Sequence, residues 1–205
     1  MNLKTHWEKI YELKNDTEMS WYQPLAENSM KLIEKAQIDE KAKIIDVGGG
    51  NSVLVKNLVD KGYSGITVLD ISQNAIDRSK VQLGSKSKQV EWFVGDIRET
   101  PLQQDHFDLW HDRAVFHFFT EEADRQLYLE QVNRSLKKDG FLVIAAFCLA
   151  GPEKCSGLPV RRYDPEILSR ELGPKYELRE LIQEPHHTPW GSEQCFIYAL
   201  FRKTF

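Results

Sequence analysis

The stretch that most constrains the fold is an apolar run that ends in an acid and three glycines, Ile44-Ile-Asp-Val-Gly-Gly-Gly-Asn-Ser52. Ile44, Ile45 and Val47 are typical of a buried parallel strand. The three glycines remove the side chains that would keep a ligand away from the backbone. Apolar residues then follow at helical spacing, and Gly62 is placed to end the helix. The segment therefore predicts a strand, a tight turn and a helix around a nucleotide-shaped ligand.

Two details of this turn restrict the ligand. The dinucleotide fingerprint G-x-G-x-x-G needs a third glycine, and Val53 stands at that position. Asp46 places a negative charge beside the loop, which disfavours a diphosphate and suits a cationic ligand. A phosphate-binding P-loop is excluded because no Gly-Lys-Ser/Thr follows the turn. A nicotinamide-dependent oxidoreductase is disfavoured, and the positively charged nucleoside S-adenosylmethionine fits the pattern.

Size and charge set further limits on the function. The 205 residues suffice for one α/β domain, so we expect a single domain over 1–205. The net charge is −4 with basic residues scattered among acids, which argues against strong nucleic-acid binding and favours a small-molecule or protein partner. No apolar run is long enough to span a membrane, and the first residues lack an apolar signal core. We expect a cytoplasmic protein.

The three cysteines are Cys148, Cys155 and Cys195. Their odd number and the absence of C-x-x-C spacing make a disulfide framework improbable. A metal site that combines them with His186 and His187 is conceivable, but burial of Cys148 and Cys195 in strands is the favoured interpretation. We therefore predict no metal.

The order of elements predicts a Rossmann-like, doubly wound α/β sheet of seven strands, mostly parallel, with an antiparallel C-terminal hairpin strand. Short loops separate alternating strands and helices, and the last two strands are too close in sequence for a crossover helix. Ser72 and Thr120 are expected to cap helices, the second closed by Asp139-Gly140, and Asp164-Pro165 opens a short helix that ends at Gly173. The predicted strands cover residues 44–47, 65–71, 90–96, 107–113, 141–147, 176–182 and 194–202.

Several predicted strands carry polar residues at their carboxyl ends: Asp46, Asp70, Asp96 and the cluster His111-Asp112-Arg113. Ligands bind such sheets in the crevice outside the carboxyl ends of the strands. A single acid at a strand end is commonly only a helix cap. Several of them in consecutive units, the second about twenty residues after the glycines, indicate a binding site.

At these positions the chain resembles the class I S-adenosylmethionine-dependent methyltransferases over nearly its whole length. Asp46-Val-Gly-Gly-Gly50 resembles the first motif of that family, and Leu136-Lys-Lys-Asp-Gly140 resembles its turn before the fifth strand. The resemblance implies that Asp70 holds the ribose hydroxyls and that Asp96 and Ile97 bind adenine. It implies S-adenosyl-L-methionine as cofactor and S-adenosyl-L-homocysteine as product. The predicted cofactor-binding residues are Trp21, Tyr22, Asp46, Gly48, Gly49, Gly50, Asn51, Asp70, Ile71, Asp96, Ile97, His111 and Arg113.

The methyl acceptor is less constrained, because displacement at a sulfonium methyl needs mainly alignment and exclusion of water. The Asn-Pro-Pro-Tyr type of motif is absent from the fourth-strand region. Asp112-Arg113-Ala114 and Ser20-Trp-Tyr-Gln23 bear some similarity to segments of a group of protein-lysine methyltransferases, from which Arg113 and Ala114 depart. We therefore predict methyl transfer to a small-molecule or protein side-chain acceptor. The alternative is a non-catalytic S-adenosylmethionine-binding module.

His111, Asp112 and His117 are the candidate catalytic residues, since imidazole titrates near neutral pH. Structural alternatives stand beside them: His111 placed for its backbone carbonyl, Asp112 paired with Arg113, and His117 filling an aromatic helix face.

The chain also divides into three predicted segments: an aromatic lid or arm (1–23), a cofactor-binding core (24–147), and acceptor-side loops with the terminal hairpin (148–205). In the arm, Trp21 and Tyr22 are expected to close over the sulfonium, and Trp7 to pack against the edge of the sheet. Three interpretations of the loop 184–191 stand side by side: an acceptor-side wall, a loop folded against 151–159, and a proline-fixed loop without ligand contact.

Overall fold

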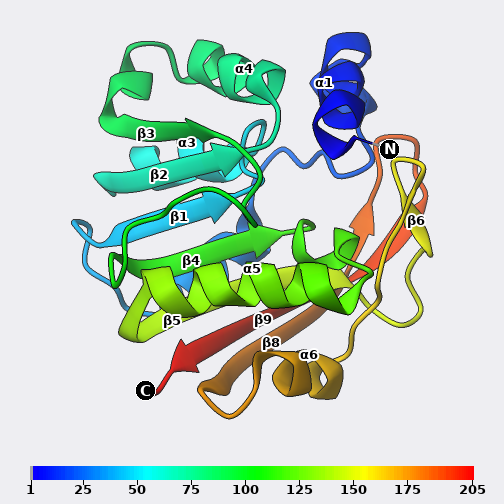
Figure 1. The fold of residues 1–205 in the computed structure, drawn as a ribbon. Helices are drawn as coiled ribbons and strands as arrows, with labels where there is room; N and C mark the ends of the chain where they lie inside the picture. Colours follow the sequence, from blue (N-terminus) through cyan, green and yellow to red (C-terminus); the bar gives the residue numbers. More distant parts are fainter. Residues whose placement is uncertain (1) are drawn as a thin grey trace.

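The computed structural model describes residues 2–205, which form a seven-stranded sheet covered by helices on both faces (Figure 1). The strand order is β3-β2-β1-β4-β5-β9-β8. Strands β3, β2, β1, β4 and β5 are parallel, and β9 is antiparallel to both of its neighbours. The strands are β1 (Lys43–Val47), β2 (Gly65–Asp70), β3 (Val90–Val94), β4 (Phe107–Arg113), β5 (Leu136–Phe147), β8 (Tyr176–His187) and β9 (Glu193–Lys203). The predicted fold class is confirmed.

The helices begin where the sequence offers capping side chains. Ser52, Ser72 and Asp164 each accept a hydrogen bond from a backbone N–H in the first turn of the helix that follows. The helices are α1 (Leu3–Leu13), α2 (Glu27–Lys35), α3 (Val53–Asp60), α4 (Gln73–Leu83), α5 (Glu122–Ser135) and α6 (Pro165–Leu172). A small hairpin of β6 (Lys154–Cys155) and β7 (Leu158–Pro159) lies apart from the main sheet.

Two predicted helix boundaries are wrong. The N-cap of α5 is Glu121, without a capping side-chain bond, rather than Thr120. The same helix ends at Ser135, and β5 starts at once at Leu136, so Asp139-Gly140 lies inside the strand rather than closing the helix. Asp139 adopts a φ of 63°, and the pairing of β4 with β5 shifts register near this point. A strand irregularity thus replaces the predicted turn.

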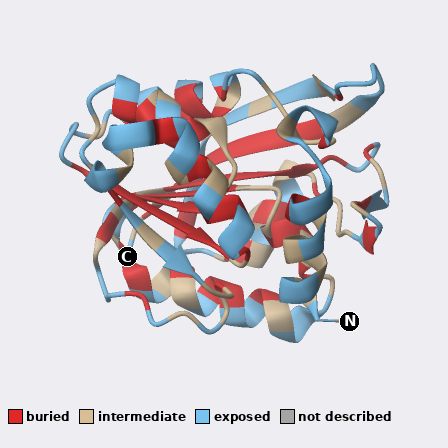
Figure 2. Ribbon diagram, turned by 90° about the horizontal axis from the view of Figure 1, so that it is seen from above, coloured by how far each residue is buried: buried red, intermediate tan, exposed pale blue. Residues whose placement is uncertain are grey.

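The core consists of one apolar layer on each face of the sheet. Helices α2, α3 and α4 cover one face, and α5 with α6 covers the other. Figure 2 shows the resulting band of buried strands between half-exposed helices. Trp110 of β4 is fully buried and donates a hydrogen bond to the Tyr128 hydroxyl of α5 (2.9 Å), which satisfies its indole N–H. The rigid strands end at one common edge, where the polar residues gather.

Cys148 and Cys195 form a disulfide, contrary to the prediction from cysteine spacing. They are 47 residues apart in the sequence, but β5 and β9 pair antiparallel, with Phe147 opposite Phe196. This register brings the two Cα atoms to 5.4 Å, within the range that a disulfide requires. Cys155 is free and buried. Cysteine spacing could not reveal the pair because only the strand register creates it.

Two searches of residues 2–205 gave negative results. No helix in this range is long and apolar enough to cross a membrane. The same residues contain no cluster of three or more His, Cys, Asp or Glu side chains that could hold a metal ion.

Candidate cofactor and acceptor site

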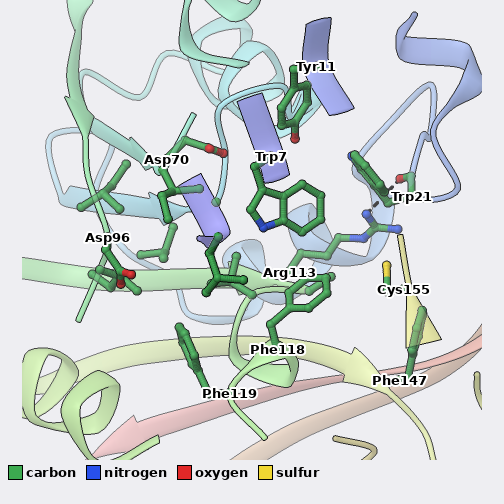
Figure 3. Close-up of a pocket in the computed structure, with 18 of the residues that line it drawn as sticks. Trp7, Tyr11, Trp21, Asp70, Asp96, Arg113, Phe118, Phe119, Phe147 and Cys155 are labelled. Carbon is green, nitrogen blue, oxygen red and sulfur yellow. Dashed lines mark hydrogen bonds between the residues drawn. The ribbon is translucent and has the colours of Figure 1, made fainter. Parts of the chain in front are cut away.

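Two adjoining pockets lie at the carboxyl ends of the central strands. The larger pocket has a volume of about 870 Å³ and the smaller one about 660 Å³. Tyr11, Trp21, Val47, Gly48 and Arg113 line both pockets, so the two form one continuous site. Figure 3 shows the larger pocket between the strand ends, the N-terminal helix α1 and the aromatic residues of the opposite wall. These volumes include the open solvent at the pocket mouths, and the mainly apolar lining with a few polar groups is typical of small-molecule sites.

The glycine turn after β1 is packed so tightly that side chains cannot be added. Gly48 has a φ of +70°, and a Cβ there would overlap the Val115 side chain. A Cβ on Gly49 would overlap the Asp46 carboxylate, and one on Gly50 would lie 2.7 Å from Asp70 Oδ2. The turn therefore brings bare backbone to the pocket, as the sequence predicted.

A Gly48→Ala substitution is expected to weaken S-adenosylhomocysteine binding by roughly 10-fold or more, because the added methyl forces the turn or Val115 into the pocket. Gly173→Ala is the matched control, since Gly173 also has a positive φ (+77°) but nothing within 4 Å of an added Cβ. Both variants should lose about 1 kcal/mol of stability from backbone strain. Isothermal titration and chemical unfolding measure the two effects. Equal cofactor affinity in the two variants would contradict the assignment.

Asp70, at the end of β2, lies in the larger pocket and organises the glycine turn. Its Oδ2 accepts the Gly50 backbone N–H (3.0 Å), and its Oδ1 accepts that of Ser72 (2.8 Å). Burial raises the pKa of Asp70 to about 6, and these backbone N–H bonds limit the rise. A carboxylate with remaining lone pairs can accept the two hydroxyls of a ribose. Ile71 follows it in the pocket lining.

Asp96, after β3, is fixed by Arg98. The Arg98 backbone N–H (3.0 Å) and Nε (2.9 Å) both donate to Asp96 Oδ1, and the guanidinium also pairs with Asp124. Burial opposes ionisation of Asp96, but the hydrogen bonds from Arg98 lower its pKa overall. Asp96 and Ile97 both line the larger pocket, as Asp70 does. The structure thus brings these predicted residues together.

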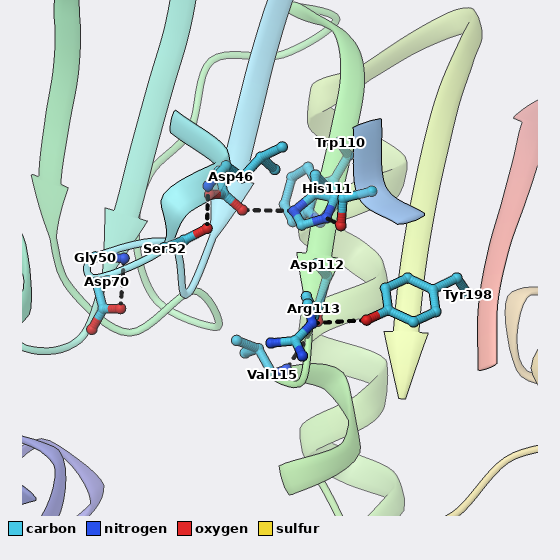
Figure 4. Close-up of polar contacts among 12 residues, drawn as sticks. Asp46, Gly50, Ser52, Asp70, Trp110, His111, Asp112, Arg113, Val115 and Tyr198 are labelled. Carbon is cyan, nitrogen blue, oxygen red and sulfur yellow. Dashed lines mark hydrogen bonds and ion pairs between the residues drawn. The ribbon is translucent and has the colours of Figure 1, made fainter. Parts of the chain in front are cut away.

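Asp46 and His111 lie side by side on β1 and β4 and form a buried pair (Figure 4). Asp46 Oδ1 is 2.7 Å from His111 Nδ1, and His111 Nε2 is 2.8 Å from the Ser29 hydroxyl of α2. All three residues are about 1% exposed. Asp46 Oδ2 has no hydrogen-bond partner among residues 2–205, and Asp46 lines the smaller pocket. This orphaned buried oxygen fits a cationic ligand group, and His111 orients it.

Asp112 and His117 do not line either pocket. Asp112 accepts the backbone N–H groups of Val115 (2.9 Å) and Phe116 (3.0 Å) and the Tyr128 hydroxyl (2.7 Å), so it holds the turn after β4. His117 is fully buried in the 3₁₀ turn Phe116–Phe118, and burial together with Arg113 lowers its pKa to about 3. A neutral, enclosed imidazole cannot exchange protons with an acceptor. The structure places neither Asp112 nor His117 in the pocket lining, so their catalytic role stays a prediction without support from the geometry.

Arg113 does not pair with Asp112, the structural alternative considered above. Its Nη1 donates to the Trp21 carbonyl (3.0 Å), its Nε donates to the Tyr198 hydroxyl (3.0 Å), and its guanidinium lies 4.9 Å from the centre of the Phe196 ring. Figure 4 shows the side chain directed across the strand ends toward Tyr198. Arg113 therefore connects β4 with the terminal hairpin and with the N-terminal segment.

The N-terminal segment closes the larger pocket through Trp7 and Trp21. Their rings meet edge to face at 5.7 Å, and Trp7 also contacts Phe118 at 5.2 Å. The prediction for Trp7 is wrong, because its ring lines the pocket rather than the edge of the sheet. Tyr22 lines the smaller pocket and not the larger one. Asn51 also lines the smaller pocket and donates to Asp16 (2.8 Å).

Helix α1 is held in place by its contacts with α4. The Glu8 carboxylate accepts the Ser72 hydroxyl (2.9 Å) and the backbone N–H groups of Gln73 (2.7 Å) and Asn74 (3.1 Å). A carboxylate at this position satisfies the unpaired donors of a helix N-terminus. Arg78 of α4 in turn donates to backbone carbonyls near the end of α1.

The residues that form the far wall of the larger pocket were not predicted from the sequence. Cys155, Gln194, Phe147 and Phe196 line it, all from the last third of the chain. The first half of the predicted loop 184–191 is strand, because β8 runs through His187. His186 Nε2 lies 2.7 Å from the Ser20 carbonyl, so this region contacts the N-terminal segment. No local motif marks these residues, since strand pairing alone brings them to the pocket.

Comparisons with known proteins show what the chain is similar to. The methyltransferase domain family matches residues 45–144. Human EEF1A lysine methyltransferase 2 is 26% identical over 98% of this chain and 85% of that protein. A Burkholderia thailandensis 1,6-didemethyltoxoflavin-N1-methyltransferase structure with bound S-adenosylhomocysteine has a TM-score of 0.77 at 18% identity, covering 99% of this chain and 88% of the other. A methyltransferase structure from Anabaena variabilis has a TM-score of 0.75 at 14% identity, covering 99% and 96%. The chain belongs to the class I S-adenosylmethionine-dependent methyltransferases.

Proposed function

We propose that this methyltransferase acts on a small acceptor with a flat, apolar body, held in the aromatic part of the larger pocket. The observation that carries the proposal is the wall formed by Trp7, Trp21, Phe118, Phe147 and Phe196. Aromatic faces stack on flat molecules and exclude water. S-adenosylmethionine supplies an activated methyl group, so the remaining task of the protein is to align the acceptor with it.

The proposed cofactor contacts follow from the polar groups at the strand ends. Asp70 would hold the ribose hydroxyls, Asp96 and Ile97 the adenine, and the free Asp46 Oδ2 the ammonium group. The backbone of Gly48 to Gly50 would border the methionyl part, with Asn51 and Tyr22 beyond it. The division into an arm, a core and acceptor-side loops and the cytoplasmic location stay predictions.

A protein lysine is the second candidate, and the similarity to human EEF1A lysine methyltransferase 2 favours it. Lysine is cationic at neutral pH and must lose a proton before it can attack a methyl group. The carboxylates of the larger pocket, Asp70 and Asp96, lie at the cofactor end, and the charged side chain on the acceptor side is Arg113. This charge distribution favours the small acceptor.

The test is methyl transfer from tritium-labelled S-adenosylmethionine into a lysate separated by size. We expect label in the fraction below about 1 kDa, and we expect none with an Asp70→Ala variant, which serves as the inactive control. Label that appears only in a protein band would replace the small acceptor with a protein side chain. Cofactor binding without transfer to any fraction would instead support a non-catalytic binding module.

A further inference from the structure

Arg113 is the charged group of the acceptor side, and its charge is not neutralised by an acid. Its hydrogen-bond partners in the described chain are the Trp21 carbonyl and the Tyr198 hydroxyl, both uncharged. Within residues 2–205, no carboxylate forms an ion pair with it, and its Nη2 is buried without a hydrogen-bond partner. Arg113 is partly buried, and a partly buried cation without a counter-charge carries a desolvation penalty that an anionic ligand would offset.

The surroundings of Arg113 would confine such a ligand to the pocket. The guanidinium lies over the Phe196 ring, and Figure 3 shows it between Trp21 and Cys155 on the side of the pocket away from Asp70 and Asp96. Arg113 lines the larger pocket together with Cys155 and Phe196. Partial burial against the Phe196 ring strengthens the electrostatic interactions of Arg113 relative to those in water.

The positive charge of Arg113 also acts on the pKa of two neighbouring groups. Burial lowers the pKa of His186, and Arg113 lowers it further. Burial raises the pKa of the Cys155 thiol, whereas the guanidinium opposes that rise. The site is therefore polarised, with acids around the position of the cationic cofactor and a cation at the acceptor end.

We propose that Arg113 selects an acceptor that reacts as an anion, such as an aromatic carboxylate, thiolate or phenolate. This rests on the proposed function, because it assigns a charge to the small acceptor of the same pocket. Arg113 is then a specificity-determining residue. A guanidinium suits this role because it stays protonated and presents several donors in a fixed plane.

The chemical step is balanced without a general base. The acidic acceptor loses its proton to solvent before transfer, and Arg113 favours the resulting anion. A lone pair of the anion forms a bond to the methyl carbon, while the carbon–sulfur bond breaks and its electrons remain on sulfur. The products are a neutral methylated acceptor and S-adenosylhomocysteine. Because opposite charges disappear in this step, apolar walls favour it.

The experiment measures the binding of three probes of similar shape to the enzyme saturated with S-adenosylhomocysteine. The probes are benzoate, benzamide and benzylamine, and isothermal titration gives their affinities. We expect benzoate to bind at least about 10-fold more tightly than the other two, as for a charge-assisted hydrogen bond. Arg113→Gln should remove this preference, and Arg113→Lys should keep part of it. Arg202→Gln is the matched control, because Arg202 pairs with Asp139 at the opposite end of β9.

A second arm tests whether Arg113 binds the cofactor carboxylate instead. Affinities of S-adenosylhomocysteine and of 5′-methylthioadenosine, which lacks the amino-acid end, are compared in the Arg113→Gln variant. Unchanged affinity for both supports the proposal. A loss of 10-fold or more that is confined to S-adenosylhomocysteine would overturn it, as would benzamide or benzylamine binding as tightly as benzoate, or an absence of benzoate binding. None of these binding results depends on the labelling experiment. Failure of the proposed function would appear in the labelling experiment, and failure of the Arg113 proposal would appear in the binding measurements.

Discussion

An Asp70→Ala enzyme is expected to bind S-adenosylhomocysteine at least about 100-fold more weakly than the wild type. The buried Asp70 carboxylate already holds Gly50 and Ser72 through their backbone N–H groups and faces the larger pocket. Removing it takes away a proposed pair of charge-assisted bonds to the ribose, each worth about 1.5–3 kcal/mol. It also releases the glycine turn. Isothermal titration measures the affinity directly.

Two further variants separate the loss of contacts from a general loss of structure. Asp70→Asn keeps the shape of the side chain and one acceptor, so its affinity should fall between those of the wild type and Asp70→Ala. Asp77→Ala removes an acid from an exposed face of α4 and should bind normally. If Asp70→Ala bound the product as tightly as Asp77→Ala does, Asp70 would not be a cofactor ligand.

The raised pKa of Asp70 adds a pH signature to this prediction. Because the folded-state pKa of about 6 exceeds the ordinary value of 3.8, burial favours the protonated form. The stability from this group is present below about pH 4 and is lost as the pH rises through about 6. Ligand binding has the opposite dependence, because the ribose needs the carboxylate. We expect affinity to decrease as the pH falls below about 6, and this decrease to be absent in Asp70→Asn.

Removing the Cys148–Cys195 disulfide is expected to lower the free energy of unfolding by about 4 kcal/mol. The bond closes a loop with a sequence separation of 47, and the loop entropy of the unfolded chain sets this magnitude. It joins the end of β5 to β9, two strands that also carry Phe147 and Phe196 of the aromatic wall. Denaturant unfolding of Cys195→Ser under oxidising conditions measures the loss.

The controls use the third cysteine and a reductant. Cys155 is free and takes no part in the cross-link. Cys155→Ser should therefore leave the contribution of the disulfide to the free energy of unfolding unchanged. Treating the wild type with dithiothreitol should reproduce the loss seen in Cys195→Ser, whereas the same reductant should have no effect on Cys195→Ser itself. Wild-type stability that is the same with and without reductant would contradict the prediction.

The parts of the fold that could be predicted from the sequence are those with a local signal. The glycine turn, the acids Asp70 and Asp96 and the terminal hairpin each depend on residues close together in the chain. The Asp46–His111 pair and the Cys148–Cys195 disulfide depend instead on which strands are neighbours. Strand neighbours are set by the packing of the whole sheet, so residue spacing gives no direct sign of these pairs.

The positions of the aromatic residues in the pocket also could not be predicted from the sequence. Trp7 and Trp21 belong to one segment, and nothing in their spacing distinguishes a ring that lines a pocket from one that packs on an edge. In the structure α1 lies against α4, which turns Trp7 toward Phe118 and the pocket. Cys155 and Gln194 reach the same pocket from separate hairpins. Contacts between segments that are far apart in the sequence determine each of these positions.

The hydrogen bonds between Glu8 and the start of α4 bear on the release of the product. Helix α4 starts directly after the strand that carries Asp70, and Glu8 satisfies the donors at its first turn. We expect the predicted lid movement of α1 to exchange these three hydrogen bonds for water and so to slow product release. The dissociation rate of the product would then depend on one carboxylate that lies outside the lining of the larger pocket.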